Sequence, residues 1–432
     1  MIRSHKIALD PNNRQRTYFQ KSAGVARFAY NWALAEWNQQ YQAHKTDPSL
    51  PKPSEGALRR QLNSIKRQQF PWILEVTKNA PQMAIIQLGQ AFKNFFKGTA
   101  KRPVFHKKGK VKDSFTLSND QFSVQDSKIR VPGLGWVRMR EQLRFTGKII
   151  SATVSRTADK WFVSISVEVE AAPAQAKNQG SVGVDLGISA MATLSNGQKV
   201  AGPKPHKALL KRQRRLSRSL SRKLEAAKVK AGLKPKQKIP KGAKIPLSSN
   251  ARKAKTKLSR LHAKIANIRQ DALHKLTSGL VQRFALIGIE DLNVKGMMQN
   301  RKLARSIADI SFFEFRRQLQ YKSELYGSTV VAADQWYPSS KTCSDCGHKL
   351  DKLPLKVREW VCPECGCVHD RDINAAVNIE KYARMAVIGP AGSSPVAVCG
   401  ETGSGLCFGA GETGLGEAEI QRQIGLSTFE YV

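Results

Sequence analysis

The sequence predicts an α/β multidomain protein whose second half builds a mixed sheet with acidic residues at its strand ends. Two apolar runs support this, because one ends on Asp185 and the other, Ala285–Leu292, carries Glu290 near its C-terminal end. A third acid, Asp372, stands at the start of the helix-like segment His369–Ile379. A carboxylate inside an apolar strand is costly unless a cation neutralises it. Each acid alone could be an ion-pair partner or a metal ligand.

Three acids in such positions favour the metal site. Mg²⁺ prefers oxygen ligands, usually a few carboxylates together with water and phosphate. Two such ions about 4 Å apart can hold the attacking and leaving oxygens of a phosphodiester during hydrolysis. Carboxylates from two strands and a following helix suit that task.

The charge of the chain points to a polyanionic partner. The 432 residues include 72 Lys and Arg against 33 Asp and Glu, which gives a net charge of +39. A membrane is the competing partner, but no stretch approaches the roughly 18 apolar residues of a spanning helix. The N-terminus lacks the apolar core of a secretory signal. We therefore expect a cytoplasmic, nucleoid-associated protein that binds nucleic acid.

The N-terminal third predicts a strand followed by helices. Residues 1–10 suggest one short strand, and Arg16–Tyr41 repeats apolar residues at helical spacing. A second helix should end before Pro71, and Pro81 should open a third. The outer faces of these helices are basic. They could be merely solvated, but the overall charge favours contact with phosphates.

A change of composition at Lys101 marks a β-rich region. Basic residues mixed with Phe105 and Phe115 suit backbone neutralisation and base stacking. The alternating runs that follow, up to Glu168, predict a small antiparallel domain that pairs with the N-terminal strand. Ala171–Gly180 has the composition of a linker.

A hairpin and a very basic stretch follow Asp185. Asn196-Gly197 predicts a type I′ turn, in which both residues have positive φ. Lys204–Arg269 then contains 23 Lys and Arg against one acid, Glu225. Two helical patterns flank its Pro/Gly/Lys-rich centre. A solvated, disordered run is the alternative, but its place between two acid-bearing strands favours a folded nucleic-acid channel.

Two CxxC pairs predict a structural zinc site. Cys343 and Cys346 are followed, after fifteen intervening residues, by Cys362 and Cys365. Four cysteine ligands leave no open position, so catalytic zinc is the weaker alternative. Nearby Cys367 could substitute for a ligand, but we expect it not to take part.

The last segment, from Ile388 to Val432, is glycine-rich and has no clear period, which predicts a flexible tail. Its GETGSG and GAGETG sequences lack the Gly-Lys-Ser/Thr ending of a phosphate loop.

The order of elements from Ser181 is hairpin, helices, strand, helix, strand, helix, as in the RNase H-like layout. Five motifs add a family resemblance: GVDLGI (183–188), IGIEDLNVKGM (287–297), PSSKTCSDCG (338–347), WVCPECG (360–366) and HDRDINAAVNI (369–379). In this order they closely resemble the TnpB (OrfB) proteins of insertion sequences, relatives of the type V CRISPR effector nucleases. The resemblance extends to RFAYNWAL at 27–34 and covers nearly the whole chain except the tail.

The resemblance implies a domain organisation. A β-barrel wedge domain would take residues 1–10 and 104–180, interrupted by a helical recognition domain at 11–103. An RNase H-like (RuvC) nuclease domain would take 181–340 and 367–387, with a Cys₄ zinc-binding insert at 341–366 and the tail at 388–432.

The resemblance also implies an activity. Family members are RNA-guided DNA endonucleases that use a guide RNA from the transposon end and cut double-stranded DNA beside a short motif. Asp185, Glu290 and Asp372 would be the catalytic acids that hold two Mg²⁺ ions, and Asp370 could assist them. Cys343, Cys346, Cys362 and Cys365 would bind zinc.

Two other functions remain open at this point. A nuclease-inactive, RNA-guided DNA-binding repressor would be expected to lack some of the acids, whereas this chain keeps all three. A DNA transposase could use the same three acids, but the Cys₄ insert between the second and third acid favours the guided nuclease.

Overall fold

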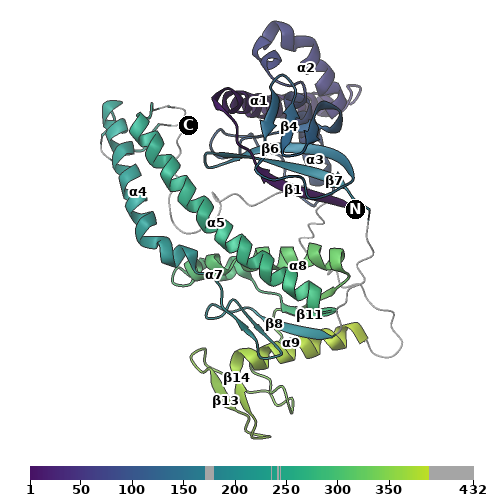
Figure 1. Cartoon of the computed structure of the whole chain (residues 1–432), viewed down its shortest axis with the longest axis vertical. Coiled ribbons are helices and arrows are strands. Elements are labelled where there is room, and N and C mark those ends of the chain that lie inside the picture. The colour runs from purple at the N-terminus through teal and green to yellow at the C-terminus, as the bar shows by residue number, and fades with distance from the viewer. Residues whose placement is uncertain (171–179, 235, 241–242, 244, 389–432) are drawn as a thin grey trace.

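The computed structural model describes residues 1–170, 180–234, 236–240, 243 and 245–388. Most of the predicted linker, and the predicted tail from residue 389 onward, lie outside the described residues. Within these ranges no helix is both long enough and apolar enough to cross a membrane. The described chain forms an N-terminal lobe and a C-terminal lobe, with two long helices running between them (Figure 1).

The N-terminal lobe contains two antiparallel sheets. The four-stranded sheet has the order β1-β7-β6-β2, and the three-stranded sheet has the order β3-β4-β5. An antiparallel bridge between Leu9 and Met139 joins them. The strands are β1 (Ile2–Ala8), β2 (Ser114–Ser118), β3 (Ser123–Gln125), β4 (Lys128–Val131), β5 (Gly135–Arg138), β6 (Lys148–Thr157) and β7 (Lys160–Glu168). The predicted pairing of the N-terminal strand with this β-region is confirmed, since β1 pairs with β7 along its whole length.

Three helices are inserted between β1 and β2: α1 (Asn13–Thr46), α2 (Glu55–Gln69) and α3 (Asn79–Phe96). Helix α1 begins after Asn12, whose side chain accepts the backbone N–H of Gln15 in a capping box. Its apolar face packs on the sheet through Phe19, whose ring contacts those of Phe115 and Trp161 at centroid distances of 5.9 and 5.2 Å.

The predicted start of the third helix is wrong by two residues. Helix α3 begins at Asn79, and Pro81 lies within its first turn. Proline is tolerated there because the first N–H groups of a helix have no partner inside the helix.

The C-terminal lobe is built on a five-stranded mixed sheet of order β10-β9-β8-β11-β12. Strand β8 is parallel to β11, and β11 is parallel to β12, whereas β8, β9 and β10 are antiparallel. The strands are β8 (Ser181–Asp185), β9 (Ala192–Leu194), β10 (Lys199–Val200), β11 (Leu286–Glu290) and β12 (Thr329–Ala333). This order confirms the predicted hairpin followed by strands that cross over through helices.

Helices cover both faces of this sheet (Figure 1). Apolar residues of α5 and α8, among them Leu280 and Phe315, share a buried core with the strands. Helix α9 lies against the opposite face. The helices of this lobe are α4 (Pro205–Lys230), α5 (Ser249–Arg283), α6 (Val294–Gln299), α7 (Ala304–Ile310), α8 (Phe312–Tyr326) and α9 (Arg371–Ile388).

The predicted type I′ turn at Asn196-Gly197 is wrong. Of these two residues only Gly197 has positive φ, at +84°. The side-chain oxygen of Asn196 accepts the N–H of Gln198 at 3.1 Å, and the N–H of Leu194 donates to the carbonyl of Gln198. The loop therefore spans three residues, which requires a left-handed conformation only at its last position.

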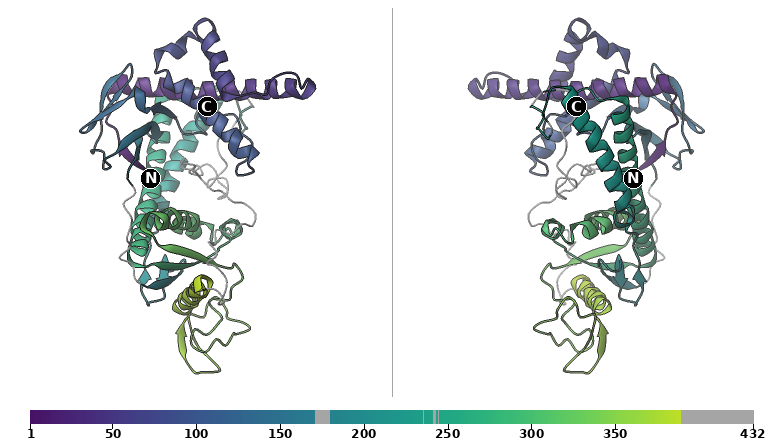
Figure 2. Two further views of the ribbon diagram at one scale, coloured as in Figure 1. Left: turned by 90° about the vertical axis from the view of Figure 1, so that its right-hand side faces the viewer. Right: turned by 90° about the vertical axis from the view of Figure 1, so that its left-hand side faces the viewer.

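Helices α4 and α5 form a long basic hairpin that rises from the C-terminal sheet toward the N-terminal lobe (Figures 1 and 2). This confirms the two helical patterns predicted around the Pro/Gly/Lys-rich centre. On the α5 side, Arg260 pairs with Asp159 in the turn between β6 and β7, with Nε 2.9 Å from Oδ1. The hairpin therefore contacts both lobes.

Candidate active site and metal centre

The register of β8 and β11 brings two of the predicted acids to one edge of the sheet. In this parallel pair Gly183 lies beside Gly288, and Val184 lies beside Ile289. Asp185 and Glu290 are the next residues of their strands. Since the strands run in the same direction, both carboxylates lie at the C-terminal ends of adjacent strands.

Two glycines allow α9 to bring the third acid to the same edge. A Cβ atom on Gly183 would lie 1.8 Å from the carbonyl oxygen of Ala376, and one on Gly288 would lie 2.7 Å from that of Ile379. Both contacts are with the backbone of α9, so neither can be relieved by moving a side chain. The helix thus rests directly on the two strands, with Asp372 in its first turn.

The charges of the other two acids act on Asp185. Burial raises the pKa of Asp185 well above its usual value, and the nearby charges of Glu290 and Asp372 raise it further. Arg371 and Arg358 partly oppose this effect. A group of partly buried like charges favours a cation, because neutralisation removes both the repulsion and the desolvation penalty.

Glu290 is held by a hydroxyl group from the segment that follows β12. Burial raises its pKa, while the Ser339 hydroxyl opposes this by donating to Glu290 Oε1 at 2.8 Å. The carboxylate therefore has a defined orientation.

The structure gives Asp370 and Asp372 different surroundings. Asp370 Oδ1 accepts the N–H groups of Asp372 and Ile373 at 3.1 and 3.0 Å, and Oδ2 lies 2.6 Å from Lys199 Nζ. Although burial alone would raise it, these contacts hold the pKa of Asp370 below its usual value. The carboxylate of Asp372 instead pairs with Arg358 at 3.2 Å. Asp370 therefore caps the start of α9, whereas the charge of Asp372 acts on Asp185.

The three acids are near one another but not in mutual contact. Among the described residues, they are not a group whose ligand oxygens all lie within 4.8 Å of one another. Their oxygen donors nevertheless fit hard divalent cations, which are also coordinated by waters and phosphate oxygens. A small hollow of about 60 Å³ adjoins Glu290 and is lined also by Asp291, Asp334 and Tyr337.

The four predicted zinc ligands come together in the structure. The Sγ atoms of Cys343, Cys346, Cys362 and Cys365 all lie within 4.8 Å of one another, with Cys343 and Cys362 buried. Cys367 is outside this group. The set fits tetrahedral zinc in both number and type of ligand.

A glycine closes the tight turn that follows each CxxC pair. The N–H of Gly347 donates to the carbonyl of Cys343, and the N–H of Gly366 donates to that of Cys362, both at 3.0 Å. Both glycines have positive φ, of +80° and +71°. His369 Nε2 lies 3.0 Å from Cys343 Sγ, a contact that the sequence did not reveal.

Two buried asparagines, which the sequence analysis missed, join the cysteine cluster to the acidic edge. The side-chain amides of Asn374 and Asn378 on α9 donate to the carbonyl of Thr342 at 2.8 and 2.7 Å. Asn378 also donates to the carbonyl of Ser339 at 2.8 Å. The only sequence signal was two asparagines four residues apart within an otherwise apolar helical face.

A second polar cluster anchors the basic hairpin to the C-terminal lobe. Asp309 of α7 is 5% exposed and accepts the backbone N–H groups of His206 and Lys207 at 3.1 and 3.2 Å. It also pairs with Arg269 of α5 at 2.7 Å. One carboxylate therefore caps α4 and binds α5.

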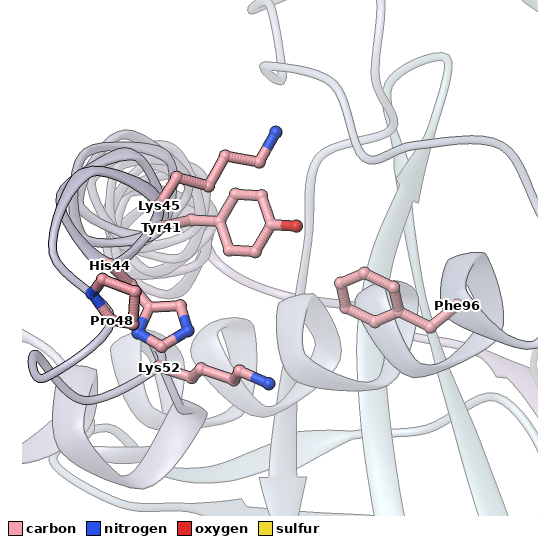
Figure 3. A pocket seen from close by; sticks show the side chains of 6 residues that line it. All are labelled: Tyr41, His44, Lys45, Pro48, Lys52 and Phe96. Atoms are coloured by element: carbon pink, nitrogen blue, oxygen red, sulfur yellow. The ribbon is translucent and has the colours of Figure 1, made fainter.

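The N-terminal lobe contains a cationic and aromatic groove (Figure 3). Its volume is about 550 Å³, and it lies between the C-terminal ends of α1 and α3. The lining residues are Tyr41, His44, Lys45, Pro48, Lys52 and Phe96. Lys45 Nζ lies 5.4 Å from the centroid of the Tyr41 ring, and Phe96 is 63% exposed. Exposed rings beside cations are suited to unstacked bases and phosphates.

Three family models match the chain. A model described as "Probable transposase" (OrfB, IS605) matches residues 164–301, a helix-turn-helix domain of the same family matches 1–46, and a Cas12f1-like TNB domain matches 312–379. Together they cover both lobes and the cysteine cluster. Two of the three define the class as OrfB proteins of the IS605 type.

Similar proteins cover almost the whole length. A Streptomyces pristinaespiralis protein named "Putative RNA-guided DNA endonuclease" is 33% identical over 381 residues, 87% of this chain and 88% of that protein. The Escherichia coli K12 protein InsQ, of the same description, is 31% identical over 88% of this chain and 91% of its own length. A solved Cas12f1–sgRNA–target DNA complex aligns with a TM-score of 0.49 and 15% identity, over 85% of this chain and 83% of that one. The chain belongs to the TnpB (OrfB) family.

Proposed function

We propose that this protein is an RNA-guided DNA endonuclease that cuts double-stranded DNA next to a short recognition motif. The observation that carries the proposal is that Asp185, Glu290 and Asp372 lie near one another at one edge of a sheet whose glycines admit α9. Relatives described as RNA-guided DNA endonucleases support it along nearly the whole chain.

The chemistry follows from the donor set of an RNase H-like (RuvC) site. Asp185, Glu290 and Asp372 would hold two Mg²⁺ ions, which supply an activated water and neutralise the charge that develops on the phosphate. The hydroxyl of Ser339 keeps the Glu290 carboxylate oriented. Arg358 pairs with Asp372, and its 61% exposed side chain would leave that carboxylate when a cation binds.

The partners would be a guide RNA from the transposon end and the target DNA. A protein of net charge +39 can grip the backbones of an RNA scaffold and a heteroduplex, while base pairing supplies the sequence specificity. The α4–α5 hairpin and the groove of Figure 3 offer basic surfaces on the two lobes. The cysteine cluster would hold a structural zinc ion that fixes the segment carrying Ser339.

The proposal is tested by sequencing the RNA that co-purifies with the protein expressed from its native locus. A single abundant species that ends in non-coding flanking sequence is the expected result. Random cellular RNA, or no RNA, would contradict the proposal that the protein binds a guide RNA. Transfer of DNA ends without a guide would favour a transposase, the function named in the matching family model.

A further inference from the structure

Trp336 is an exposed tryptophan next to the proposed catalytic edge. Its side chain is 84% exposed, whereas Trp161 and Trp360 are 2% and 7% exposed. A large aromatic side chain normally gains free energy by leaving water. A single exposed ring needs no ligand to explain it, but this ring lies on an ordered turn whose neighbouring residues line the hollow beside Glu290.

The backbone that carries Trp336 is ordered. The N–H of Trp336 donates to Asp334 Oδ1 at 2.8 Å, and the N–H of Tyr337 donates to the Asp334 carbonyl at 3.0 Å. The ring of Tyr337 packs against Tyr382 of α9 at a centroid distance of 4.9 Å. Neighbouring residues thus hold the turn against α9, while Trp336 extends into solvent.

This turn lies at the rim of the acidic hollow. Gln335 and Tyr337, the two neighbours of Trp336, line the same hollow as Glu290. Ser339, three residues further on, is the residue that orients Glu290.

The charge of the hollow explains why an aromatic contact would be useful there. Glu290 and Asp334 repel a phosphodiester backbone unless cations are bound, whereas the charge of Asp291 is paired with Arg316. Stacking of a base on an aromatic ring does not depend on that charge, and it contributes about 1–3 kcal/mol per base. It can hold a strand in place where ionic contacts cannot.

We propose that Trp336 is a base-stacking subsite for the DNA strand that enters the carboxylate site. The inference rests on the proposed function. An unpaired base next to the cleaved phosphate would stack on the indole, which sets the position of the strand relative to Asp185 and Glu290. Trp336 is then a positioning residue and takes no part in the chemical step.

The test compares Trp336→Ala, Trp336→Phe and Trp336→Leu in the complete complex with its co-purified RNA and matched DNA. We expect Trp336→Ala to raise the KM for DNA by about tenfold to a hundredfold with little change in kcat, and to broaden the set of cut positions. Trp336→Phe should keep a KM close to that of the unmodified protein, whereas Trp336→Leu should have the raised KM of Trp336→Ala, because only an aromatic ring stacks. Leu355→Ala, which changes another highly exposed apolar side chain, is the control.

A second measurement separates stacking from any structural role. An abasic nucleotide at the stacked position should raise the KM of the unmodified protein and leave that of Trp336→Ala unchanged. The loss should also persist when salt is raised, unlike the loss caused by removing a lysine.

An unchanged KM and cut pattern in Trp336→Ala, or equal rescue by Leu and Phe, would overturn the inference. Failure of the proposed function has a different signature, because the unmodified protein itself would then cut no matched DNA.

In that case stacking is still measured by quenching of 2-aminopurine in a single-stranded DNA oligonucleotide. Equal quenching by the unmodified protein and Trp336→Ala would reject the subsite.

Discussion

Gly183 of β8 and Gly288 of β11 lie side by side in parallel register, and the backbone of α9 rests on both of them. A side chain at either position would push the helix away from the sheet. The helix carries Asp372, and the strands end on Asp185 and Glu290. Close packing between backbones thus determines how near the three carboxylates lie.

Gly183→Ala should therefore destabilise the C-terminal lobe and abolish cleavage. The new methyl group would lie 1.8 Å from the carbonyl oxygen of Ala376, so the helix must shift. Overpacking of this kind costs about 1–3 kcal/mol or more. Thermal unfolding and cleavage assays measure the two effects.

Gly24→Ala is the matched control, because its Cβ would meet no atom within 4 Å in the middle of α1. This change should stabilise α1 by about 0.4–1 kcal/mol. If Gly183→Ala kept both wild-type stability and full cleavage, α9 would not need to rest on the strands.

Removal of zinc should unfold the segment around the cysteine cluster and reduce cleavage. Cys343→Ser removes a buried ligand, and the loop that presents Ser339 to Glu290 lies just before it. We expect loss of bound zinc, measured by metal analysis, together with a lower melting temperature. Cys367→Ser should retain the metal, since Cys367 lies outside the cluster. Equal zinc content in both variants would contradict the ligand assignment.

Asp309→Ala should release the basic hairpin from the C-terminal lobe. The change removes the acceptor for the first N–H groups of α4 and leaves Arg269, 14% exposed, without its carboxylate. Breaking a buried pair in this way costs about 3–5 kcal/mol. Hydrogen exchange should become faster at the start of α4, and RNA binding should weaken. Asp271→Ala, at an exposed acid of α5, is the control.

The stability of the C-terminal lobe should rise with pH through the titration of Lys322. This lysine of α8 is 6% exposed and donates to the hydroxyls of Thr277 and Ser278 at 2.7 and 2.9 Å. Burial lowers its pKa to about 8, an effect that nearby Glu314 partly opposes. The ordinary pKa of lysine, about 10.4, applies in the unfolded chain. At pH values between about 8 and 10.4, Lys322 is therefore mostly neutral in the folded protein and protonated in the unfolded chain. Unfolding then takes up a proton, so the free energy of unfolding rises with pH.

Chemical unfolding at several pH values measures this effect. The unmodified protein should gain stability relative to Lys322→Met between pH 8 and 10, by at most about 1.4 kcal/mol per pH unit. Lys275→Met, at an exposed position of α5, should show no such relative change. Parallel curves for the unmodified protein and Lys322→Met would show that Lys322 titrates normally.

Much of this architecture could be predicted because it depends on local patterns. Apolar runs that end on Asp185 and Glu290 are strands, and the paired cysteines form one cluster. Turn geometry was predicted less well, because the side chain of Asn196 bonds to Gln198 and leaves only Gly197 with positive φ.

The contacts that position the site could not be read from the sequence, because they join distant segments. The need for glycine in β8 and β11 becomes apparent only when α9 is seen to pack on Gly183 and Gly288. Asp309 lies 103 residues from His206, whose N–H it accepts. Asp370 and Asp372 are equivalent as residue types, and their different contacts appear only in the structure, where Asp370 caps α9 and pairs with Lys199 while Asp372 pairs with Arg358.

The central claim is guided cleavage by the three carboxylates, and one measurement tests it most directly. Matched DNA carrying a series of adjacent motifs is incubated with the protein and its co-purified RNA, in Mg²⁺, for the unmodified chain and for Asp185→Ala. The account predicts cleavage by the unmodified chain and loss of cleavage in Asp185→Ala, with RNA and DNA binding retained. Cleavage by Asp185→Ala at the wild-type rate would contradict it.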